Sequence, residues 1–413
     1  MMGTIKKWLL PVGRPVKKFF RDRRWNWMYA VTFPGYYDKW KREPIQKKKV
    51  LFVEQRYSQL SDNFRLIYEE LTKQQAYEIH VHFLRQRDVT RRQFEKNCKA
   101  MLKDMATAEY VFLDDASKVL GRVEKRPETV VIQVWHACGA FKKFGMSTAS
   151  LKFGGSRKAI EKYPAYSNLD YVTVSSPQVA WAYREAMNLE GKPTQVVATG
   201  VSRTDVFFKE ENRQRALDKL YGLMPSAKEK KIILYAPTFR GTISQAQSPR
   251  ELDVELMQKK LGEEYVLLLK HHPFVKERPG LPEGVEGVFA QDMTERMTIE
   301  ELLFAADVCV SDYSSVVFEY ALFERPMAFL APDLAEYFDW RGFYYDYQEL
   351  TPGPVFAHTE ELTEYLLHLE ERFDRNRVRE FREKFMSACD GKATERILEL
   401  VLGRKQAGEN GVQ

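Results

Sequence analysis

The chain of 413 residues has few cysteines and no long apolar run. Its four cysteines, at positions 98, 138, 309 and 389, form no Cys-x-x-Cys pair. This argues against a disulfide or zinc framework and indicates a reducing, cytoplasmic compartment. No stretch reaches the roughly 20 apolar residues of a membrane-spanning helix. A secretory signal is also absent, because "WLLPVG" is short and is broken by Pro11. HExxH, DxD and Walker motifs are missing, so we expect no metal and no cofactor.

Positive charge is concentrated at one end of the chain. The net charge is +6, but residues 1–49 hold 14 Lys/Arg and 3 Asp/Glu, a net of +11, which leaves −5 for the remainder. Four of the seven tryptophans, Trp8, Trp25, Trp27 and Trp40, lie in the same segment. Cations mixed with indoles favour an anionic membrane surface. The alternatives are a solvated basic tail and, less favoured, a nucleic-acid partner.

From residue 48 onward, short apolar runs alternate with amphipathic segments. We expect strands at 48–54, 77–85, 108–115, 129–136, 169–176, 194–200, 230–238, 264–273, 307–315 and 326–332, and helices at 63–73, 91–106, 176–188, 250–262, 298–306, 314–324, 359–373 and 378–388. Alternating units of this kind predict an α/β protein with two parallel sheets. The expected divisions are a basic segment 1–47, domains 48–225 and 226–403, and a polar tail 404–413.

Polar clusters follow five of the expected strands. They are "WH" ending at His136, "GVSRTD" at 200–205, "PTFRG" at 237–241, "HH" at 271–272 and "DYSS" at 312–315. In doubly wound sheets ligands bind beyond the carboxyl ends of the strands. Five clusters at this one position therefore predict a site in a cleft between the two domains.

Ser314 and Ser315 open an expected helix. The first amides of a helix lack internal partners and attract anions, so the two hydroxyls either bind phosphate or simply cap the helix. Arg203, Arg240 and His272 stand at neighbouring strand ends. Their presence favours the phosphate interpretation.

Glu319 and His136 have both a chemical and a structural interpretation. Glu319 lies about a turn and a half into the same helix, where it would bind a polyol, stay solvated or pair with Arg325. His136 is a candidate general base, because imidazole titrates near neutrality, although a single histidine in a strand is more often structural. Lys142 and Lys143 follow it closely, as suits a substrate that carries phosphate.

Several of these stretches resemble one known family. "WHACGAFKKFG", "GVSRTD", "YAPTFRG", "KHHPF" and "SDYSSVVFEYALFERPMAFLAPDLAEYFDWRGFYYDY" occur in order and look like the CDP-glycerol glycerophosphotransferases of wall teichoic acid synthesis. The resemblance runs from about residue 48 to about 390. Many members read "WHGTPLK" at the first motif, and the variant present here resembles primases and ribitol-phosphate transferases.

The resemblance implies a GT-B-like pair of Rossmann-like domains acting at the cytoplasmic face of the cell membrane. Such an enzyme moves glycerol phosphate from CDP-glycerol, or ribitol phosphate from CDP-ribitol, to a hydroxyl of an undecaprenyl-diphosphate-linked acceptor and releases CMP. It implies His136 as the general base and His272 as a catalytic contact to the donor diphosphate. The implied donor-binding residues are Arg203, Thr238, Arg240, Asp312, Ser314, Ser315 and Glu319, and the implied acceptor-side residues are Lys142 and Lys143.

Two rival functions remain open on the residues alone. One is a nucleotide-binding protein without turnover, against which the clustered histidines argue. The other is a GT-B glycosyltransferase that moves a sugar. A donor screen that compares CDP-polyols with UDP-sugars separates all three.

Overall fold

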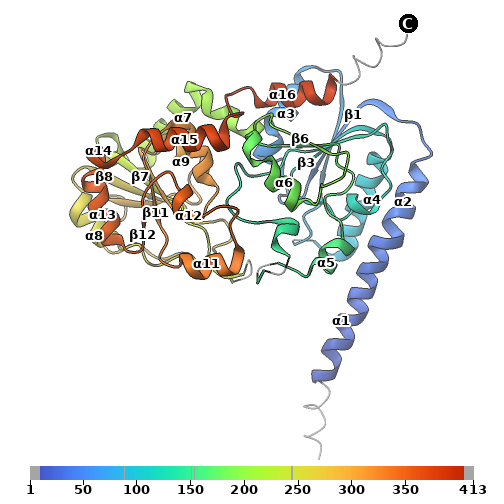
Figure 1. The fold of residues 1–413 in the computed structure, drawn as a ribbon, viewed down its shortest axis with the longest axis horizontal. Coiled ribbons are helices and arrows are strands. Elements are labelled where there is room, and N and C mark those ends of the chain that lie inside the picture. The colour runs from blue at the N-terminus through green and yellow to red at the C-terminus, as the bar shows by residue number, and fades with distance from the viewer. Residues whose placement is uncertain (1–9, 88, 150, 153, 243–244, 404–413) are drawn as a thin grey trace, which may run out of the picture. The chain divides into compact units, whose positions relative to one another are not determined.

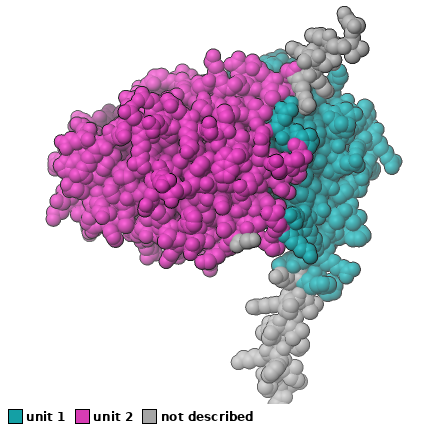
Figure 2. Space-filling view, viewed as in Figure 1, with its two compact units in different colours: residues 1–136, 158–172, 193–195 teal, residues 137–157, 173–192, 196–413 magenta. Residues whose placement is uncertain are grey.

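The chain forms two compact units. The computed structural model describes residues 10–403 except 88, 150, 153 and 243–244. Unit 1 comprises residues 1–136, 158–172 and 193–195, and unit 2 comprises residues 137–157, 173–192 and 196–413 (Figure 2). Trp8 and the expected polar tail at 404–413 lie outside the described residues.

The first sheet has six strands in the order β2-β1-β3-β4-β5-β6 (Figure 1). They are β1 (Gln46–Glu54), β2 (Glu78–Phe83), β3 (Ala108–Leu113), β4 (Val130–Gln133), β5 (Tyr171–Thr173) and β6 (Gln195–Val197). The pairings of β1 with β2 and β3, of β3 with β4 and of β4 with β5 are all parallel. Every residue of β3 and β4 is buried, as expected for strands covered on both faces. All six strands match the predicted ones.

The second sheet also has six strands, in the order β12-β11-β10-β7-β8-β9. They are β7 (Lys231–Tyr235), β8 (Tyr265–Leu269), β9 (Ala290–Asp292), β10 (Val308–Ser311), β11 (Met327–Leu330) and β12 (Val355–Phe356). The sequence predicted four of them. It missed β9 and β12, which have three and two residues and are too short to show a period.

Helices connect the strands of both sheets. They are α1 (Leu10–Trp27), α2 (Phe33–Trp40), α3 (Asp62–Lys73), α4 (Arg91–Met105), α5 (Arg157–Lys162), α6 (Ala180–Ala186), α7 (Glu210–Leu223), α8 (Val254–Leu261), α9 (Ile299–Ala305), α10 (Val316–Tyr320), α11 (Leu334–Arg341), α12 (Tyr347–Leu350), α13 (Thr359–Leu367), α14 (Leu369–Arg372), α15 (Arg375–Met386) and α16 (Ala393–Leu402). Each predicted helix has a counterpart among them. In the described part of the chain no helix is both long and apolar enough to cross a bilayer.

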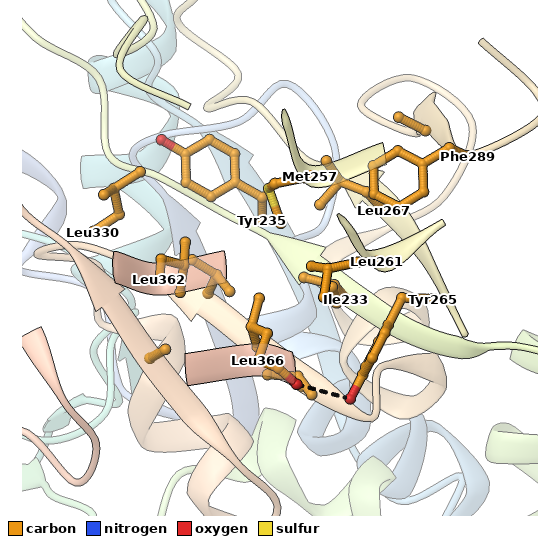
Figure 3. Packing of buried hydrophobic residues seen from close by; sticks show 14 of the residues in the cluster. Ile233, Tyr235, Met257, Leu261, Tyr265, Leu267, Phe289, Leu330, Leu362 and Leu366 are labelled. Carbon is orange, nitrogen blue, oxygen red and sulfur yellow. Dashed lines mark hydrogen bonds between the residues drawn. The ribbon is translucent and has the colours of Figure 1, made fainter. Parts of the chain in front are cut away.

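A patch of buried side chains holds two helices against the second sheet. Ile233 and Tyr235 of β7 and Leu267 of β8 face Met257 of α8 and Leu362 of α13 (Figure 3). All five side chains are at most 3% exposed. The Tyr265 hydroxyl donates to the Leu366 carbonyl at 3.3 Å, so this buried polar group is satisfied. This packing fixes the strands whose carboxyl ends carry the polar clusters.

The basic N-terminal segment is not a separate tail. A π-helical turn (Met28–Thr32) joins α1 to α2. Phe33 and Tyr37 of α2 are fully buried within unit 1, and Trp25 packs on Phe94 of α4 at 5.9 Å between ring centroids. The expectation that residues 1–47 lie apart from the first domain therefore does not hold for residues 28–40, whose aromatic side chains complete its core.

The compact units also divide the chain differently from the predicted boundary at 225. Residues 196–225 belong to unit 2, where α7 packs on α9. Within the same unit Ser175 donates to the Phe385 carbonyl at 2.7 Å, and the Ser202 and Thr394 hydroxyls lie 2.8 Å apart. Segments that precede β7 in the sequence therefore belong to unit 2 because they contact the C-terminal helices. These tertiary contacts are not visible in the order of strands and helices along the chain.

Candidate active site

Polar side chains gather where the strand order of each sheet reverses. In the first sheet β1 lies beside both β2 and β3, and in the second sheet β7 lies beside both β8 and β10. Such switch points are where open α/β sheets bind ligands. Glu54 and Asp114 stand at the ends of β1 and β3, whereas Thr238 and Asp312 follow β7 and β10.

His136 is held by the backbone that follows β3. Its Nδ1 lies 2.9 Å from the Asp114 carbonyl oxygen. A carbonyl can only accept, so Nδ1 must carry the proton and donate it. The basic lone pair of the neutral ring therefore resides on Nε2. The side chain is 20% exposed, and Asp115 Oδ2 lies 4.0 Å from Nδ1.

The residue before His136 adopts a backbone conformation that is rare for a large side chain. Trp135 has φ +61°, and its amide donates to Gln133 Oε1 at 3.0 Å. Gln133 is fully buried and also donates to the Asp115 carbonyl at 3.0 Å. The Trp135 and His136 rings lie 4.2 Å apart. A positive φ costs conformational energy in a residue other than glycine. Such conformations persist where surrounding contacts impose them, often at functional sites. Here the contacts fix the direction of the imidazole.

Two carboxyl groups share the interior beneath His136. Glu54 and Asp114 are both fully buried. Burial raises the pKa of Asp114 well above its usual range, and a hydrogen bond with Glu54 raises it further. Asp114 Oδ1 also accepts from the Gln55 amide at 3.3 Å. This pair ties β1 to the segment whose carbonyl orients His136.

Unit 2 contains an ion-pair network at its switch point. Asp312 accepts from the Thr238 amide at 2.8 Å and the Thr238 hydroxyl at 2.9 Å. Arg240 lies 2.9 Å from Asp312 and 2.5 Å from Asp333. Its guanidinium also lies over the Tyr313 ring, 5.1 Å from the centroid. Two carboxylates thus neutralise Arg240, which acts as a brace for the β7 and β10 ends.

His272 has the opposite tautomer to His136. The Phe274 amide donates to His272 Nδ1 at 3.1 Å, so Nδ1 accepts and the ring proton is on Nε2. The His272 ring packs on both Phe239 and Phe274, with 4.7 Å between centroids in each pair, and those two phenyl rings contact each other at 5.6 Å. His272 is thereby presented as a hydrogen-bond donor. Its neighbour His271 is buried, and burial lowers its pKa, so it is a neutral structural residue.

The serines and Glu319 lie along α10. The hydroxyl of Ser314 accepts from the Val316 amide at 3.4 Å, and Ser315 is the residue that precedes the helix. Glu319 is 5% exposed and pairs with Arg203 at 2.5 Å. The alternative in which Arg325 holds Glu319 is wrong, because Arg325 donates to the Phe304 and Ala306 carbonyls. Arg203 and Glu319 therefore form a buried pair within unit 2.

Lys142 lies beside the ion-pair network of unit 2. Its backbone pairs with Phe343, and the Lys143 amide donates to the Gly342 carbonyl at 3.1 Å. Gly139 allows this course, since it has φ +60° and a Cβ there would lie 2.3 Å from the Phe318 ring. Burial lowers the pKa of Lys142 to about 7, with a further decrease from Arg341, while Asp312 acts in the opposite direction. The contacts therefore place Lys142 beside the expected donor residues.

Several of these residues escaped the sequence analysis although a signal was present. Glu54 ends the first strand in "VEQR", and Asp114 and Asp115 follow the third strand in "LDDA". They obey the same rule that selected His136. Asp333 also follows an expected strand, the one at 326–332, and it reaches Arg240 from the segment just before α11.

Known proteins share both the sequence and the fold. Residues 36–403 match the family described as CDP-Glycerol:Poly(glycerophosphate) glycerophosphotransferase. A teichoic acid ribitol-phosphate primase of Bacillus spizizenii is 36% identical over 364 residues, which are 87% of this chain and 92% of that protein. A teichoic acid glycerol-phosphate primase of the same organism is 32% identical over 305 residues, or 74% and 76% of the two chains.

The fold comparison agrees. The wall teichoic acid polymerase TagF superposes with a TM-score of 0.75 at 24% identity, covering 95% of this chain and 98% of that one. This likeness supports the predicted α/β, GT-B-like architecture with two parallel sheets. The match to the family model spans most of the chain, and the chain therefore belongs to the CDP-glycerol:poly(glycerophosphate) glycerophosphotransferase family, as a teichoic acid phosphotransferase.

Proposed function

We propose that this chain transfers a polyol phosphate from a CDP-polyol to a hydroxyl group of a lipid-linked acceptor. The acceptor oxygen attacks the phosphorus that bears the polyol, and the bond from that phosphorus to the CMP oxygen breaks. CMP leaves with the electron pair. The hydroxyl proton goes to His136 Nε2. The reaction is balanced without any redox partner.

The observation that carries this proposal is the opposite tautomers of the two histidines. His136 donates from Nδ1 and so has a basic Nε2, whereas His272 accepts at Nδ1 and so donates from Nε2. Displacement at a phosphate needs one group that accepts a proton from the nucleophile. It also needs donors toward the charge that builds on phosphate and leaving group. His136 supplies the proton acceptor, and His272 supplies a hydrogen-bond donor.

The phosphate groups are assigned to unit 2. Lys142 supplies a charge that titrates near neutrality, and Ser314 and Ser315 supply hydroxyls at the start of α10. Arg240 is neutralised by Asp312 and Asp333, so we assign it to positioning Thr238 and Asp312. The buried Arg203–Glu319 pair supports α10 in the same way.

For the donor, we favour CDP-ribitol over CDP-glycerol. The ribitol-phosphate primase is more similar to this chain than the glycerol-phosphate primase, at 36% against 32% identity and over a longer alignment. The test is CMP release from CDP-ribitol, CDP-glycerol and a UDP-sugar at equal concentration, each with a lipid-linked acceptor. Faster release from CDP-ribitol supports the assignment. Release only from CDP-glycerol changes the polyol, and turnover of the UDP-sugar alone refutes the phosphotransferase.

We further propose that α1 and the π-helical turn lie on the anionic cytoplasmic surface of a membrane. Phe20, Trp27 and Val31 recur at helical spacing and are 63%, 64% and 45% exposed. Together with Arg23 and Arg24 they line one hollow on this helix. An aromatic face flanked by cations is typical of helices that bury one side at the lipid interface. Such an anchor would bring the enzyme to its lipid-linked acceptor.

A further inference from the structure

A cluster of nitrogen and oxygen ligands lies on the edge strand of the first sheet. His80 and His82 are two residues apart on β2, so their side chains point to the same face of the strand. Asp104, in the last turn of α4, reaches that face from elsewhere in the chain. One ligand atom from each of the three residues lies within 4.8 Å of the others. The sequence analysis expected no metal because it found no metal-binding motif, and this cluster forms none, since Asp104 follows His82 by 22 positions.

The hydrogen bonds of the cluster define which atoms converge. Asp104 Oδ2 lies 2.9 Å from His82 Nε2 and 3.4 Å from His80 Nδ1. The other His80 nitrogen, Nε2, lies 2.6 Å from the Glu78 carboxylate, which accepts and so requires a proton on Nε2. In a neutral ring His80 Nδ1 then directs its lone pair at the Asp104 carboxylate. A cation between the lone pair and the carboxylate makes this contact favourable.

The surroundings are arranged as those of a metal ligand set. A histidine that binds metal through one nitrogen usually donates from the other to a carboxylate, as His80 does to Glu78. A ligating carboxylate is usually hydrogen-bonded as well, and Lys49 donates to Asp104 Oδ1 at 2.9 Å. Cations are also favoured near the last turn of a helix.

We propose that His80 Nδ1, His82 Nε2 and Asp104 Oδ2 bind one Zn²⁺ ion or a similar divalent transition metal. Two imidazoles and one carboxylate suit zinc, which takes four ligands, and the partial exposure of the three side chains leaves room for a water as the fourth. The ion would join β2 to α4 on the edge of unit 1. None of the three residues belongs to the proposed transfer machinery, so the inference is independent of the proposed function.

The test measures metal binding to the full chain without a histidine tag. The protein is stripped with EDTA and titrated with Co²⁺, whose visible absorption reports tetrahedral nitrogen and oxygen ligation. Zn²⁺ is then titrated by calorimetry. We expect one ion per chain, a loss of affinity above 100-fold in His80→Ala/His82→Ala, and a loss of about 10- to 100-fold in Glu78→Gln. Asp104 is left intact because its removal would leave the buried Lys49 ammonium unpaired.

A histidine of unit 2 serves as the matched control. His368 is 46% exposed and lies 3.2 Å from Glu364, so His368→Ala removes an imidazole beside a carboxylate away from β2. It should leave the titration unchanged. Circular dichroism checks that the β2 double variant is folded. Absence of a tight site in the native chain, or the same stoichiometry in the folded β2 double variant, would overturn the proposal.

Discussion

The position of a single proton on each of two imidazoles gives the sharpest residue-scale test. His136→Ala removes the proposed base, so turnover should fall by about 10²- to 10⁴-fold while donor affinity stays close to that of the native chain. His272→Ala should instead weaken CDP-polyol binding, since it removes a hydrogen-bond donor that packs on Phe239 and Phe274. Steady-state kinetics and calorimetry with CDP-ribitol separate the two effects.

His368→Ala, the exposed histidine beside Glu364, is the control for both variants and should behave as the native chain. Native turnover in His136→Ala would remove the general base from this position. If donor affinity fell equally in His136→Ala and His272→Ala, the distinction drawn from the tautomers would fail.

Lys142 should make donor binding depend on pH. Its pKa lies at about 7, lowered first by burial and then by Arg341. A diphosphate favours the ammonium form, so binding above pH 7 must take up a proton. We expect the affinity for CDP-ribitol to fall by up to about tenfold per pH unit from pH 7 to 9 and to be flat for this group below pH 7. Calorimetry in buffers of different ionisation enthalpy measures the proton uptake.

The same shift has a definite sign for stability. The folded chain holds fewer protons on Lys142 than the unfolded chain between pH 7 and about 10.4, so this group makes the free energy of unfolding rise with pH in that window. Lys142→Arg keeps a charge at every pH and should abolish the proton uptake on donor binding. Equal donor affinity of the native chain at pH 6.5 and 8.5 would separate Lys142 from the diphosphate.

At the scale of elements, the N-terminal helices contain both a core face and an outer face. Phe33 is fully buried in unit 1, whereas Phe20 is 63% exposed. Phe33→Ala should lower the free energy of unfolding by about 3–5 kcal/mol through lost burial and a cavity. Phe20→Ala, the matched control, should change it by less than about 0.5 kcal/mol. Urea unfolding followed by circular dichroism measures both, and equal effects would show that α2 does not stabilise the unit.

Elements were predictable where their own residues specify them. The β-branched runs "VLFV" and "VVI" predicted β1 and β4, and the apolar spacing of "NFRLIYEELTK" predicted α3. The two residues of β12 gain their strand conformation only by pairing with β11. Similarly, the charge of residues 1–49 suggested a segment apart from the first domain. The burial of Phe33 and Tyr37 was not predictable, because it depends on partners such as Tyr29 and on unit 1 as a whole.

At the scale of the whole molecule, the candidate site was predictable as far as one rule extends. Residues that follow strands, such as His136, His272 and Asp312, were found because parallel strands end at one edge. Side-chain contacts between residues that are distant in the sequence were not predictable. The contact of Arg203 with Glu319 spans more than a hundred residues, and His82 meets Asp104 from a different element. Such contacts depend on tertiary packing, about which local pattern says nothing.

The charge asymmetry of the whole chain leads to a prediction about membranes. Residues 1–49 have a net charge of +11 and the rest has −5, so anionic vesicles should attract the chain by its N-terminal end. Each cation near such a surface contributes about 1 kcal/mol before screening, and the screening length is about 8 Å at physiological salt. Arg21→Gln/Arg23→Gln/Arg24→Gln should therefore bind vesicles more weakly and with a smaller dependence on salt.

The aromatic face should supply the part of vesicle binding that salt does not remove. Phe20→Ser/Trp27→Ser removes two side chains that are 63% and 64% exposed, so it should spare folding but abolish binding at high salt. Val288→Ser, at a 57% exposed site in unit 2, is the control. Co-sedimentation with phosphatidylglycerol vesicles at low and high salt decides the matter. Since the proposed acceptor is lipid-linked, the aromatic variant should also lose activity on vesicles while keeping it on a short soluble acceptor. Unchanged sedimentation of both the arginine and the aromatic variants would refute the helix as the membrane anchor, because the exposed residues that define its outer face would then contribute nothing.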